Sequence, residues 1–251
     1  NENDDMSGSY LGPEYSEDQI KKELSRLGAN FEILNEDEII NKTSKDLSDG
    51  NAVGWFQGRM EFGPRALGGR SILGDPRSPN MQKNLNLKVK YRESFRPFAP
   101  SILYDDLNNW FEIDSDSPYM LMVANVKKEK CITMSENEEK LFGIDKLNVK
   151  RSSIPAITHV DYSARIQTVH KNSNPKYYKL ISKFKEITGC PILINTSFNV
   201  RGEPIVNTPE DAFNCFMGTD LDKLIIGNCY LDKEKQNKGL RKDYKDKFEL
   251  D

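Results

Sequence analysis

The stretch PKYYKLISKFKEITGCPILINTSFN, residues 175–199, joins an amphipathic helix to a buried strand and then to a polar loop. Apolar side chains recur at helical spacing in its first half, at Tyr178, Ile181, Phe184 and Ile187. Gly189 is typical of a helix C-terminus, and the apolar run Pro191–Asn195 indicates a buried strand. The strand leads directly into Thr196–Asn199, and ligands commonly bind where strands end in polar loops. This stretch predicts an α/β fold with a site at a strand end.

Helix and strand patterns continue outward from this stretch. Ser16 and Gln19 form a capping box for a helix that ends near Gly28. Further helices are predicted at about 36–47, 78–88, 105–111 and 208–218. Further strands are predicted at 51–56, 98–103, 119–126, 154–160, 165–169 and 224–231. Residues 57–75 are expected to form a long loop, and 127–151 a surface excursion. Because helices and strands alternate irregularly, the predicted class is α/β or α+β with a mixed sheet.

The composition excludes several classes of protein. Of the 251 residues, 30% are charged and 37% hydrophobic, and no window approaches the roughly 20 apolar residues of a membrane helix. The four cysteines and two histidines show no metal-ligand spacing, so no metal site is expected. No secretory leader precedes the acidic first residues, and scattered thiols suit a reducing compartment. A cytoplasmic location is therefore expected.

Charge is unevenly distributed along the chain, although the net charge is only −3. Residues 1–49 contain 13 Asp and Glu against 5 Lys and Arg, whereas residues 59–96 contain nine Lys and Arg against three Asp and Glu. A basic segment inside an acidic protein indicates an anionic ligand, although a solvated helix face is the commoner explanation. Nucleic acid is disfavoured, because a sequence pI near 5.7 argues against a broad phosphate-binding surface.

Two motifs lie in the basic segment. In GRMEFGPRALGGRSIL, residues 58–73, glycines permit close backbone approach, and Arg59, Arg65 and Arg70 offer forked donors to phosphate or carboxylate. Its glycine spacing fits neither a Walker loop nor a dinucleotide fingerprint. An arginine-rich turn held by Glu61 and Asp75 is an equally good interpretation.

The second basic motif is KVKYRESFRPFAP, residues 88–100. Four cations within nine residues form a compact positive patch, and Lys90 and Arg92 share a side if the segment is extended. A solvated helix terminus is the alternative, although the neighbouring aromatic residues indicate that the segment is anchored in a core.

Two later polar segments are candidate catalytic or ligand-binding sites. The turn His159–Arg165 contains His, Asp and Ser, but triad members normally come from distant parts of a sequence. We therefore reject a Ser163 nucleophile and expect only Arg165 to face a ligand. The segment Asn195–Pro204 places amide, hydroxyl and arginine groups directly after a buried strand, which favours a ligand site.

Four motifs in the same order resemble one family. The segments are EFGPRALGGRSIL at 61–73, KVKYRESFRPFAPSIL at 88–103, IPAITHVDYSARIQTV at 154–169 and ILINTSFNVRGEPIVNTPEDA at 192–212. With the lead-in LGPEY at 11–15, they resemble the C-terminal region of nodulation-type and antibiotic-biosynthesis O-carbamoyltransferases. The resemblance covers about residues 10–231. It implies one domain there, with a tail or linker at 1–9 and a charged tail at 232–251.

The resemblance implies a fold, a reaction and a set of residues. The fold is a YrdC-like twisted mixed sheet with flanking helices around a concave basic cavity. The reaction activates carbamoyl phosphate with ATP to give carbamoyl adenylate and pyrophosphate, with Mg²⁺ carried by the nucleotide. The family signatures Lys-x-Arg and Ser-x-Asn match Lys90–Arg92 and Ser197–Asn199. The implied catalytic cations are Arg65, Lys90, Arg96 and Arg165. These four and Arg92, Asn195, Ser197 and Asn199 are the implied ligand-binding residues.

The resemblance also implies a partner. The family's N-terminal transfer domain, which holds histidine metal ligands and the acceptor hydroxyl compound, has no counterpart in these residues. The chain is expected to be a fragment or one subunit of a split enzyme, and to complete transfer only with that domain. Two alternatives remain: an RNA- or tRNA-binding YrdC-like module, and a silent domain that docks onto a transferase subunit.

Overall fold

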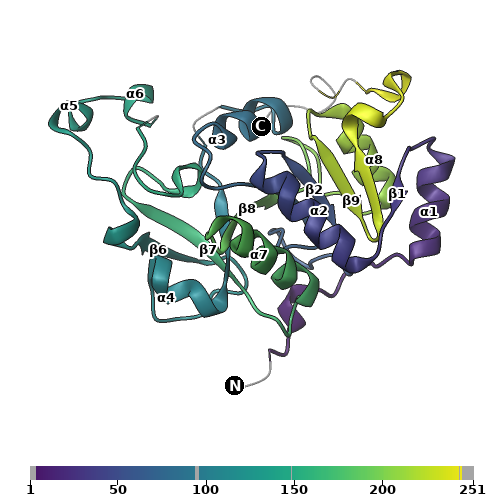
Figure 1. Cartoon of the computed structure of the whole chain (residues 1–251), viewed down its shortest axis with the longest axis horizontal. Coiled ribbons are helices and arrows are strands. Elements are labelled where there is room, and N and C mark those ends of the chain that lie inside the picture. The colour runs from purple at the N-terminus through teal and green to yellow at the C-terminus, as the bar shows by residue number, and fades with distance from the viewer. Residues whose placement is uncertain (1–3, 94–95, 148, 243, 245–251) are drawn as a thin grey trace.

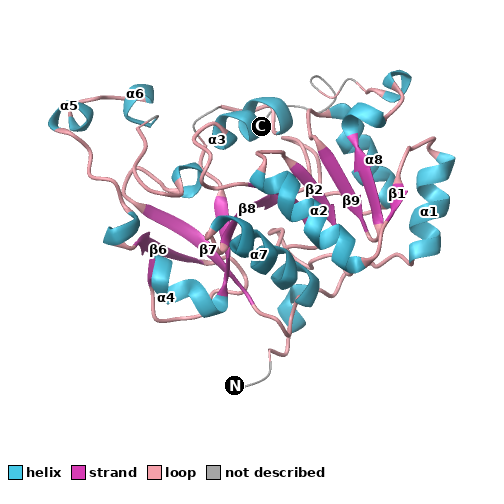
Figure 2. Cartoon of the chain, viewed as in Figure 1, coloured by secondary structure: helices cyan, strands magenta, loops and turns pink. Residues whose placement is uncertain are grey.

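A computed structural model describes residues 4–93, 96–147, 149–242 and 244. Its centre is an open mixed sheet of ten strands in the order β1-β10-β9-β2-β3-β8-β4-β7-β6-β5 (Figures 1 and 2). The β2–β9 and β4–β7 pairs are parallel, and the other pairs are antiparallel. The mixed α/β class predicted from the sequence is thus confirmed.

The strands are β1 (Glu32–Ile33), β2 (Val53–Phe56), β3 (Arg70–Gly74), β4 (Ala99–Leu103), β5 (Phe111–Glu112), β6 (Met122–Val126), β7 (Ser163–Val169), β8 (Ile192–Ser197), β9 (Lys223–Ile226) and β10 (Cys229–Asp232). The strands at the centre, β2, β3, β8 and β4, are almost wholly buried. Because both faces of these strands are covered, most of their side chains are apolar, and the polar exceptions are Arg70, Ser71, Ser101 and Asn195–Ser197.

The helices are α1 (Glu17–Arg26), α2 (Glu36–Ser48), α3 (Met81–Asn84), α4 (Leu107–Trp110), α5 (Glu136–Glu139), α6 (Ile144–Leu147), α7 (Pro175–Thr188) and α8 (Pro209–Gly218). A π-helical turn, Leu85–Val89, continues α3. Short 3₁₀ turns occupy Ser7–Ser9, Tyr104–Asp106, Lys128–Lys130, Pro155–Ile157, Lys233–Lys235 and Lys238–Leu240. In Figure 1, α2 and α7 lie in front of the sheet and α8 lies behind β9.

Local sequence explains where the longer helices begin and end. Capping boxes start α1 at Ser16, α2 at Asn35 and α8 at Thr208, so each helix satisfies its first free N–H groups. Helix α7 starts at Pro175 and ends at Gly189, whose φ of 73° is the left-handed conformation that glycine adopts without strain.

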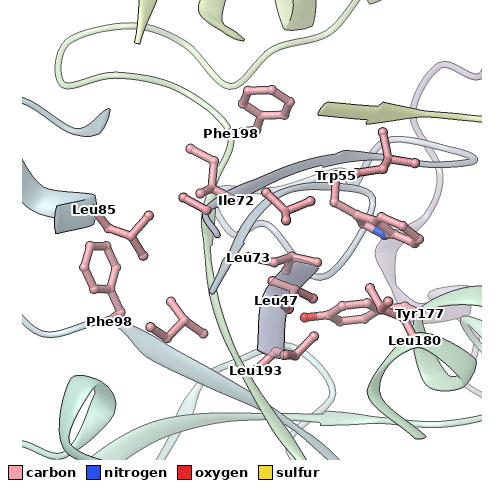
Figure 3. Close-up of a cluster of buried hydrophobic side chains, with 14 of the residues drawn as sticks. Leu47, Trp55, Ile72, Leu73, Leu85, Phe98, Tyr177, Leu180, Leu193 and Phe198 are labelled. Carbon is pink, nitrogen blue, oxygen red and sulfur yellow. The ribbon is translucent and has the colours of Figure 1, made fainter. Parts of the chain in front are cut away.

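The core lies between the sheet and these helices. Figure 3 shows Leu73 and Leu193 of the sheet gathered with Leu47 of α2 and Leu180 of α7. Each of these four side chains is fully buried. Ile72, which is next to Leu73 in β3, and Phe198 form part of the layer on the other face, because side chains alternate along a strand.

Several predicted elements differ from the structure. Residues 57–75 were expected to form a loop, but they contain the central strand β3. The strand begins at Arg70, a charged residue that can be buried there because its side chain has hydrogen-bond partners. Residues 154–160 form a 3₁₀ turn at Pro155 in place of a strand. The predicted strand 224–231 is a hairpin, β9–β10, which turns at Gly227. The helix predicted from Ser78 begins at Met81.

Parts of the two segments that were expected to be tails, 1–9 and 232–251, pack against the rest of the fold. Ser9 is buried, and the buried Gln236 donates to the carbonyl oxygens of Asn30 and Asp232, both at 2.8 Å. Tyr244 is also buried. Residues 1–3, 243 and 245–251 of the expected tails lie outside the described residues. Among the residues described, no helix is long and apolar enough to cross a membrane.

Candidate functional site

The sheet brings the end of β8 beside the start of β4. The two strands run antiparallel, and Asn195 of β8 pairs with Ala99 of β4. On its other side β8 pairs with β3, so that Ser197 lies opposite Ser71. Asn195 and Ser197 share one face of the sheet, because strand side chains alternate. Polar side chains of β3 and β8 therefore share one face of the sheet where β8 ends.

A cavity of about 180 Å³ opens at this point. Its walls come from the loop before β3, the segment before β4, and strands β7 and β8. The lining residues are Pro64, Arg65, Ala66, Arg92, Pro97, Phe98, Ala99, Met120, Arg165, Asn195, Thr196 and Ser197. We call it the arginine cavity. It brings together Arg65, Arg92, Arg165, Asn195 and Ser197, which the sequence predicted as ligand-binding residues.

Arg65 and Arg165 enter the arginine cavity from different elements. Each has a buried Nε atom with no hydrogen-bond partner among the residues described. Burial lowers the pKa of Arg165, and the nearby Arg65 guanidinium lowers it further. No Asp or Glu stands among the described residues that line this cavity, and two nearby cations in such a site favour an anion.

A buried carboxylate holds the loop that carries Arg65. Glu61 Oε1 accepts hydrogen bonds from the backbone N–H groups of Leu67, at 2.6 Å, and Gly69, at 2.7 Å. The carbonyl oxygen of Leu67 accepts from Tyr10 Oη at 2.6 Å and from Gln167 Nε2 at 2.8 Å. These contacts fix the backbone of the loop on both sides of Arg65.

The other two arginines of the glycine-rich motif do not line the arginine cavity. Arg70 is fully buried, lies 3.5 Å from the ring centroid of Phe56, and donates to backbone carbonyl oxygens that include Gly58 and Pro13. Arg59 is exposed and donates to the carbonyl oxygen of Gly12. Arg70 is thus structural, but backbone carbonyl oxygens hold its guanidinium in place of the expected Glu61 and Asp75 carboxylates, whereas Arg65 lines a cavity.

A second cavity, of about 160 Å³, adjoins the first and shares Arg92, Thr196 and Ser197 with it. It is also lined by Lys90, Arg96, Asn199, Val200, Arg201 and Gly202. We call it the lysine cavity. The two cavities together contain all eight residues that the sequence predicted for the site.

Lys90 is 4% exposed and is surrounded by oxygen atoms. Its Nζ donates to Asn199 Oδ1 at 2.7 Å, to the Asn199 carbonyl at 2.9 Å, to Ser197 Oγ at 3.2 Å and to the Ser197 carbonyl. Burial, and to a lesser extent the charge of Arg92, lowers the pKa of Lys90 to about 7. Lys90 therefore holds the Ser-x-Asn loop in place.

Arg92 lies between the two cavities. The segment is not extended, because Tyr91 has a φ of 50° between Lys90 and Arg92. Arg92 Nε donates to Asn86 Oδ1 at 2.6 Å. Burial, and then the charge of Arg96, lowers the pKa of Arg92 to about 10. Arg96 is exposed and its Nε lies 3.2 Å from Glu93 Oε2, so it is the most accessible cation of the predicted set.

Sequence reasoning missed several supporting residues. Asn86 is buried and links Arg92 to the carbonyl oxygen of Arg96, which its Nδ2 reaches at 2.8 Å. Arg201 lines the lysine cavity, and Gln167 holds the loop before β3. The sequence placed Arg201 in the favoured segment Asn195–Pro204, two residues after Ser-x-Asn, but not among the predicted site residues. An isolated Asn or Gln gives no such signal.

The turn at His159–Arg165 has no triad geometry. Ser163 Oγ donates to the Asp161 carboxylate at 2.7 Å, whereas a nucleophilic serine would donate to an imidazole. Within the described ranges, no group of three His, Cys, Asp or Glu side chains could hold a metal ion. Arg165, two residues further along β7, lines the arginine cavity, whereas Asp161 and Tyr162 line a separate cavity with residues of β5 and β6.

Comparisons with known proteins bear on this geometry. A family model described as "Carbamoyltransferase C-terminus" matches residues 44–233. The chain is 53% identical to "Uncharacterized protein sll1178" of Synechocystis, over 99% of this chain and 41% of that protein. It is 42% identical to nodulation protein NolNO of Sinorhizobium fredii, over 90% of this chain and 31% of that protein. It is 35% identical to 3'-hydroxymethylcephem-O-carbamoyltransferase of Streptomyces clavuligerus, over 74% of this chain and 32% of that protein.

The chain thus spans less than half the length of these relatives. The relatives include both a nodulation protein and an enzyme that acts on a cephem, which are the two branches that the sequence motifs resembled. The family model covers most of the chain, including the motifs that contribute to both cavities. The chain belongs to the carbamoyltransferase C-terminus family.

Proposed function

We propose that the chain is the activating part of an O-carbamoyltransferase and makes carbamoyl adenylate from carbamoyl phosphate and ATP. The observation that carries this proposal is the convergence of Arg65 and Arg165 in a cavity that adjoins the Lys90 cavity. Each arginine has a buried Nε without a partner among the described residues. Two adjoining cationic cavities suit two phosphate-bearing substrates that are used in successive steps of one reaction.

The atoms of the reaction balance in two steps. Carbamoyl adenylate contains one phosphorus atom, which comes from ATP, so the phosphoryl group of carbamoyl phosphate must leave. Water first releases it as inorganic phosphate and leaves carbamate. A carbamate oxygen then attacks the α-phosphorus of ATP, the bond to the bridging oxygen breaks, and pyrophosphate departs. Negative charge accumulates at both steps, and fixed cations stabilise it.

The two cavities divide the proposed work. Arg65 and Arg165 bind the phosphate and carbonyl oxygens of carbamoyl phosphate in the arginine cavity. Arg96, the exposed cation of the lysine cavity, contacts the polyphosphate of ATP, and Arg92 faces both substrates. Lys90 acts mainly by holding Ser197 and Asn199, because its ammonium group is already surrounded by their oxygens. Mg²⁺ would enter with ATP, because Mg²⁺ is commonly held by substrate phosphates together with one or two carboxylates.

The complete transfer requires more than this chain. We infer that residues 10–231 form the activating domain and that the activated carbamoyl group passes to an N-terminal domain, which binds the acceptor. The lengths of the relatives support this division, because the chain spans 31% to 41% of them. One relative is named as acting on a hydroxymethyl group, so a hydroxyl on a small molecule is the proposed acceptor class. The proposed location is the cytoplasm, where ATP and carbamoyl phosphate are made.

Isotope exchange tests the proposal. The chain is incubated with ATP, Mg²⁺ and labelled pyrophosphate, with or without carbamoyl phosphate. We expect label to enter ATP only when carbamoyl phosphate is present, and we expect no carbamoylated alcohol to form. Phosphate release should accompany adenylate formation in a one-to-one ratio. Exchange that is absent, or equal with and without carbamoyl phosphate, would contradict the proposal.

A further inference from the structure

A chain of hydrogen bonds fixes the orientation of the Asn195 side-chain amide. The carbonyl oxygen of Leu67 can only accept, so the Gln167 atom that lies 2.8 Å from it is Nε2. The other end of the Gln167 amide is therefore the acceptor Oε1, and the Asn195 atom 2.8 Å from it must be the donor Nδ2. Nδ2 also donates to the carbonyl oxygen of Ala66 at 3.0 Å. Reversing the Asn195 amide would oppose acceptor to acceptor at both contacts.

This orientation leaves the Asn195 carbonyl oxygen without a donor. Asn195 is 1% exposed, and its Oδ1 is buried and has no hydrogen-bond partner among the residues described. Leaving a buried acceptor unpaired costs about 1–3 kcal/mol, so such atoms commonly mark a place that another molecule completes. Asn195 lines the arginine cavity, where the buried Nε atoms of Arg65 and Arg165 are also unpaired.

The unpaired atoms specify a ligand with two kinds of group. The arginines call for an oxyanion, whereas Asn195 Oδ1 calls for an N–H or O–H donor on the same small molecule. The cavity of about 180 Å³ is smaller than the roughly 300–1,000 Å³ of pockets that enclose drug-sized ligands, so it suits a compact acyl phosphate. Carbamoyl phosphate carries an NH₂ group beside its carbonyl, and acetyl phosphate carries a methyl group at the same position.

We propose that Asn195 is the residue that selects carbamoyl over acetyl phosphate, because its Oδ1 accepts a hydrogen bond from the carbamoyl NH₂ group. This inference rests on the proposed function, since it assigns the arginine cavity to the acyl phosphate. A methyl group at that position would leave Oδ1 buried and unpaired. An analogue that lacks the partner group is therefore disfavoured by the cost of that unpaired atom.

A nucleotide could also supply a donor, through its ribose hydroxyls or its adenine amino group. The test therefore excludes nucleotide and uses two stable analogues that differ in one group. Phosphonoacetamide carries the NH₂ group of carbamoyl phosphate, and acetonylphosphonate carries the methyl group of acetyl phosphate. Calorimetry with the whole chain should show that phosphonoacetamide binds roughly tenfold more tightly, which is the effect of one well-placed hydrogen bond.

Two variants separate recognition from structure. Asn195→Leu keeps a similar volume without any polar atom, and should bind both analogues with equal affinity. Ser101→Ala is the matched control, because Ser101 Oγ lies 3.0 Å from Asn195 Nδ2 but does not line the cavity. It should keep the tenfold preference even if both affinities fall. Asn195→Ser gives a second measurement if the leucine variant does not fold, and should show at most a small preference.

Each outcome decides the inference. Equal binding of the two analogues to the unmodified chain would overturn the role of Asn195 and leave the proposed function standing, provided that exchange still requires carbamoyl phosphate. A tenfold preference that survives in Asn195→Leu would also overturn it, by placing recognition elsewhere. If neither analogue binds and no exchange occurs, the inference falls together with the proposed function.

Discussion

The Nζ atom of Lys90 lies 2.7 Å from Oδ1 of Asn199, although 109 positions separate the two residues in the chain. Ser197 Oγ lies 2.7 Å from the same Oδ1 atom. An ammonium group has three N–H donors, and four oxygen atoms of Ser197 and Asn199 lie within reach. The contact therefore ties the turn after the π-helical segment to the loop after β8, and both segments line the lysine cavity.

Loss of this contact should weaken nucleotide binding. We expect Lys90→Met to lower the affinity for Mg-ATP by about 10- to 100-fold, because the Ser-x-Asn loop that lines the lysine cavity loses hydrogen bonds to a charged group, which contribute about 1.5–3 kcal/mol. Lys88→Met is the matched control, since Lys88 is exposed two residues earlier and lines neither cavity. Calorimetric titration measures both affinities. A Lys90→Met variant that binds within twofold of the unmodified chain would contradict the positioning role.

The buried charge of Lys90 should also make stability depend on pH. Its pKa is lowered from 10.5 to about 7 in the folded protein. Between about pH 7 and 10.5 the unfolded chain therefore binds more protons at this position, and the free energy of unfolding rises with pH. Below about pH 7 both states are charged, and the full cost of burying the ammonium remains.

Denaturant unfolding at pH 7, 8 and 9 measures this dependence. The unmodified chain should gain stability over Lys90→Met by up to about 1.4 kcal/mol per pH unit across the range. The comparison with Lys90→Met cancels the titration of other groups. A difference that does not change with pH would mean that Lys90 keeps its charge in the folded protein up to pH 9.

Local patterns account for the parts of the fold that were predicted correctly. Capping residues such as Ser16 and Thr208, and the terminal Gly189, interact with residues a few positions away. The ends of these helices can therefore be predicted from a short stretch of sequence. Helix α7 was placed correctly, but its buried face is centred on Tyr177, Leu180, Ile181 and Phe184, and Ile187 is 48% exposed. The position of a helix on a sheet decides which face is buried, and periodicity alone does not specify that position.

The missed features depend on partners that are distant in the sequence. Strand β3 begins with Arg70, which can be buried only because carbonyl oxygens of residues such as Pro13 and Gly58 surround it. Nothing near Arg70 in the sequence reveals these partners. The eight predicted site residues do lie in the two adjoining cavities. The sequence does not show that Arg65 and Arg165 face a cavity while Lys90 holds a loop, because this difference depends on contacts between distant parts of the chain.

Arg65 and Arg165, the two arginines that enter the arginine cavity from different elements, should dominate the activation reaction. Arg65→Ala and Arg165→Ala should each reduce carbamoyl-phosphate-dependent pyrophosphate exchange by about 10²–10³, the usual effect of removing one preorganised donor to developing charge. Arg59→Ala is the control, because Arg59 belongs to the same motif but is exposed and lines neither cavity. Exchange rates with saturating substrates measure the effect. If Arg59→Ala and Arg65→Ala reduce the exchange rate equally, the reaction depends on the positive charge of the motif and not on the position of Arg65 in the cavity.

Gly68 should be essential because of its contact with Tyr177. Its φ is +106°, and a Cβ atom there would lie 2.3 Å from Cδ1 of the buried Tyr177 ring. Gly68→Ala should therefore destabilise the fold by more than about 2 kcal/mol, through backbone strain and overpacking. Exchange should fall as well, because the neighbouring carbonyl oxygens of Ala66 and Leu67 hold Asn195 and Gln167.

Gly143→Ala is a control that has the backbone strain of an alanine at positive φ but no steric clash with a neighbouring side chain. Gly143 also has a positive φ, 61°, but nothing lies within 4 Å of the position that a Cβ would take, so only the backbone cost of about 1–2 kcal/mol should appear. Truncating the ring with Tyr177→Leu in the Gly68→Ala background should recover part of the lost stability. Denaturant unfolding of the three variants measures these differences. If Gly68→Ala and Gly143→Ala cost the same, the Tyr177 ring yields to the added methyl group, and the loop before β3 is less tightly held than its contacts indicate.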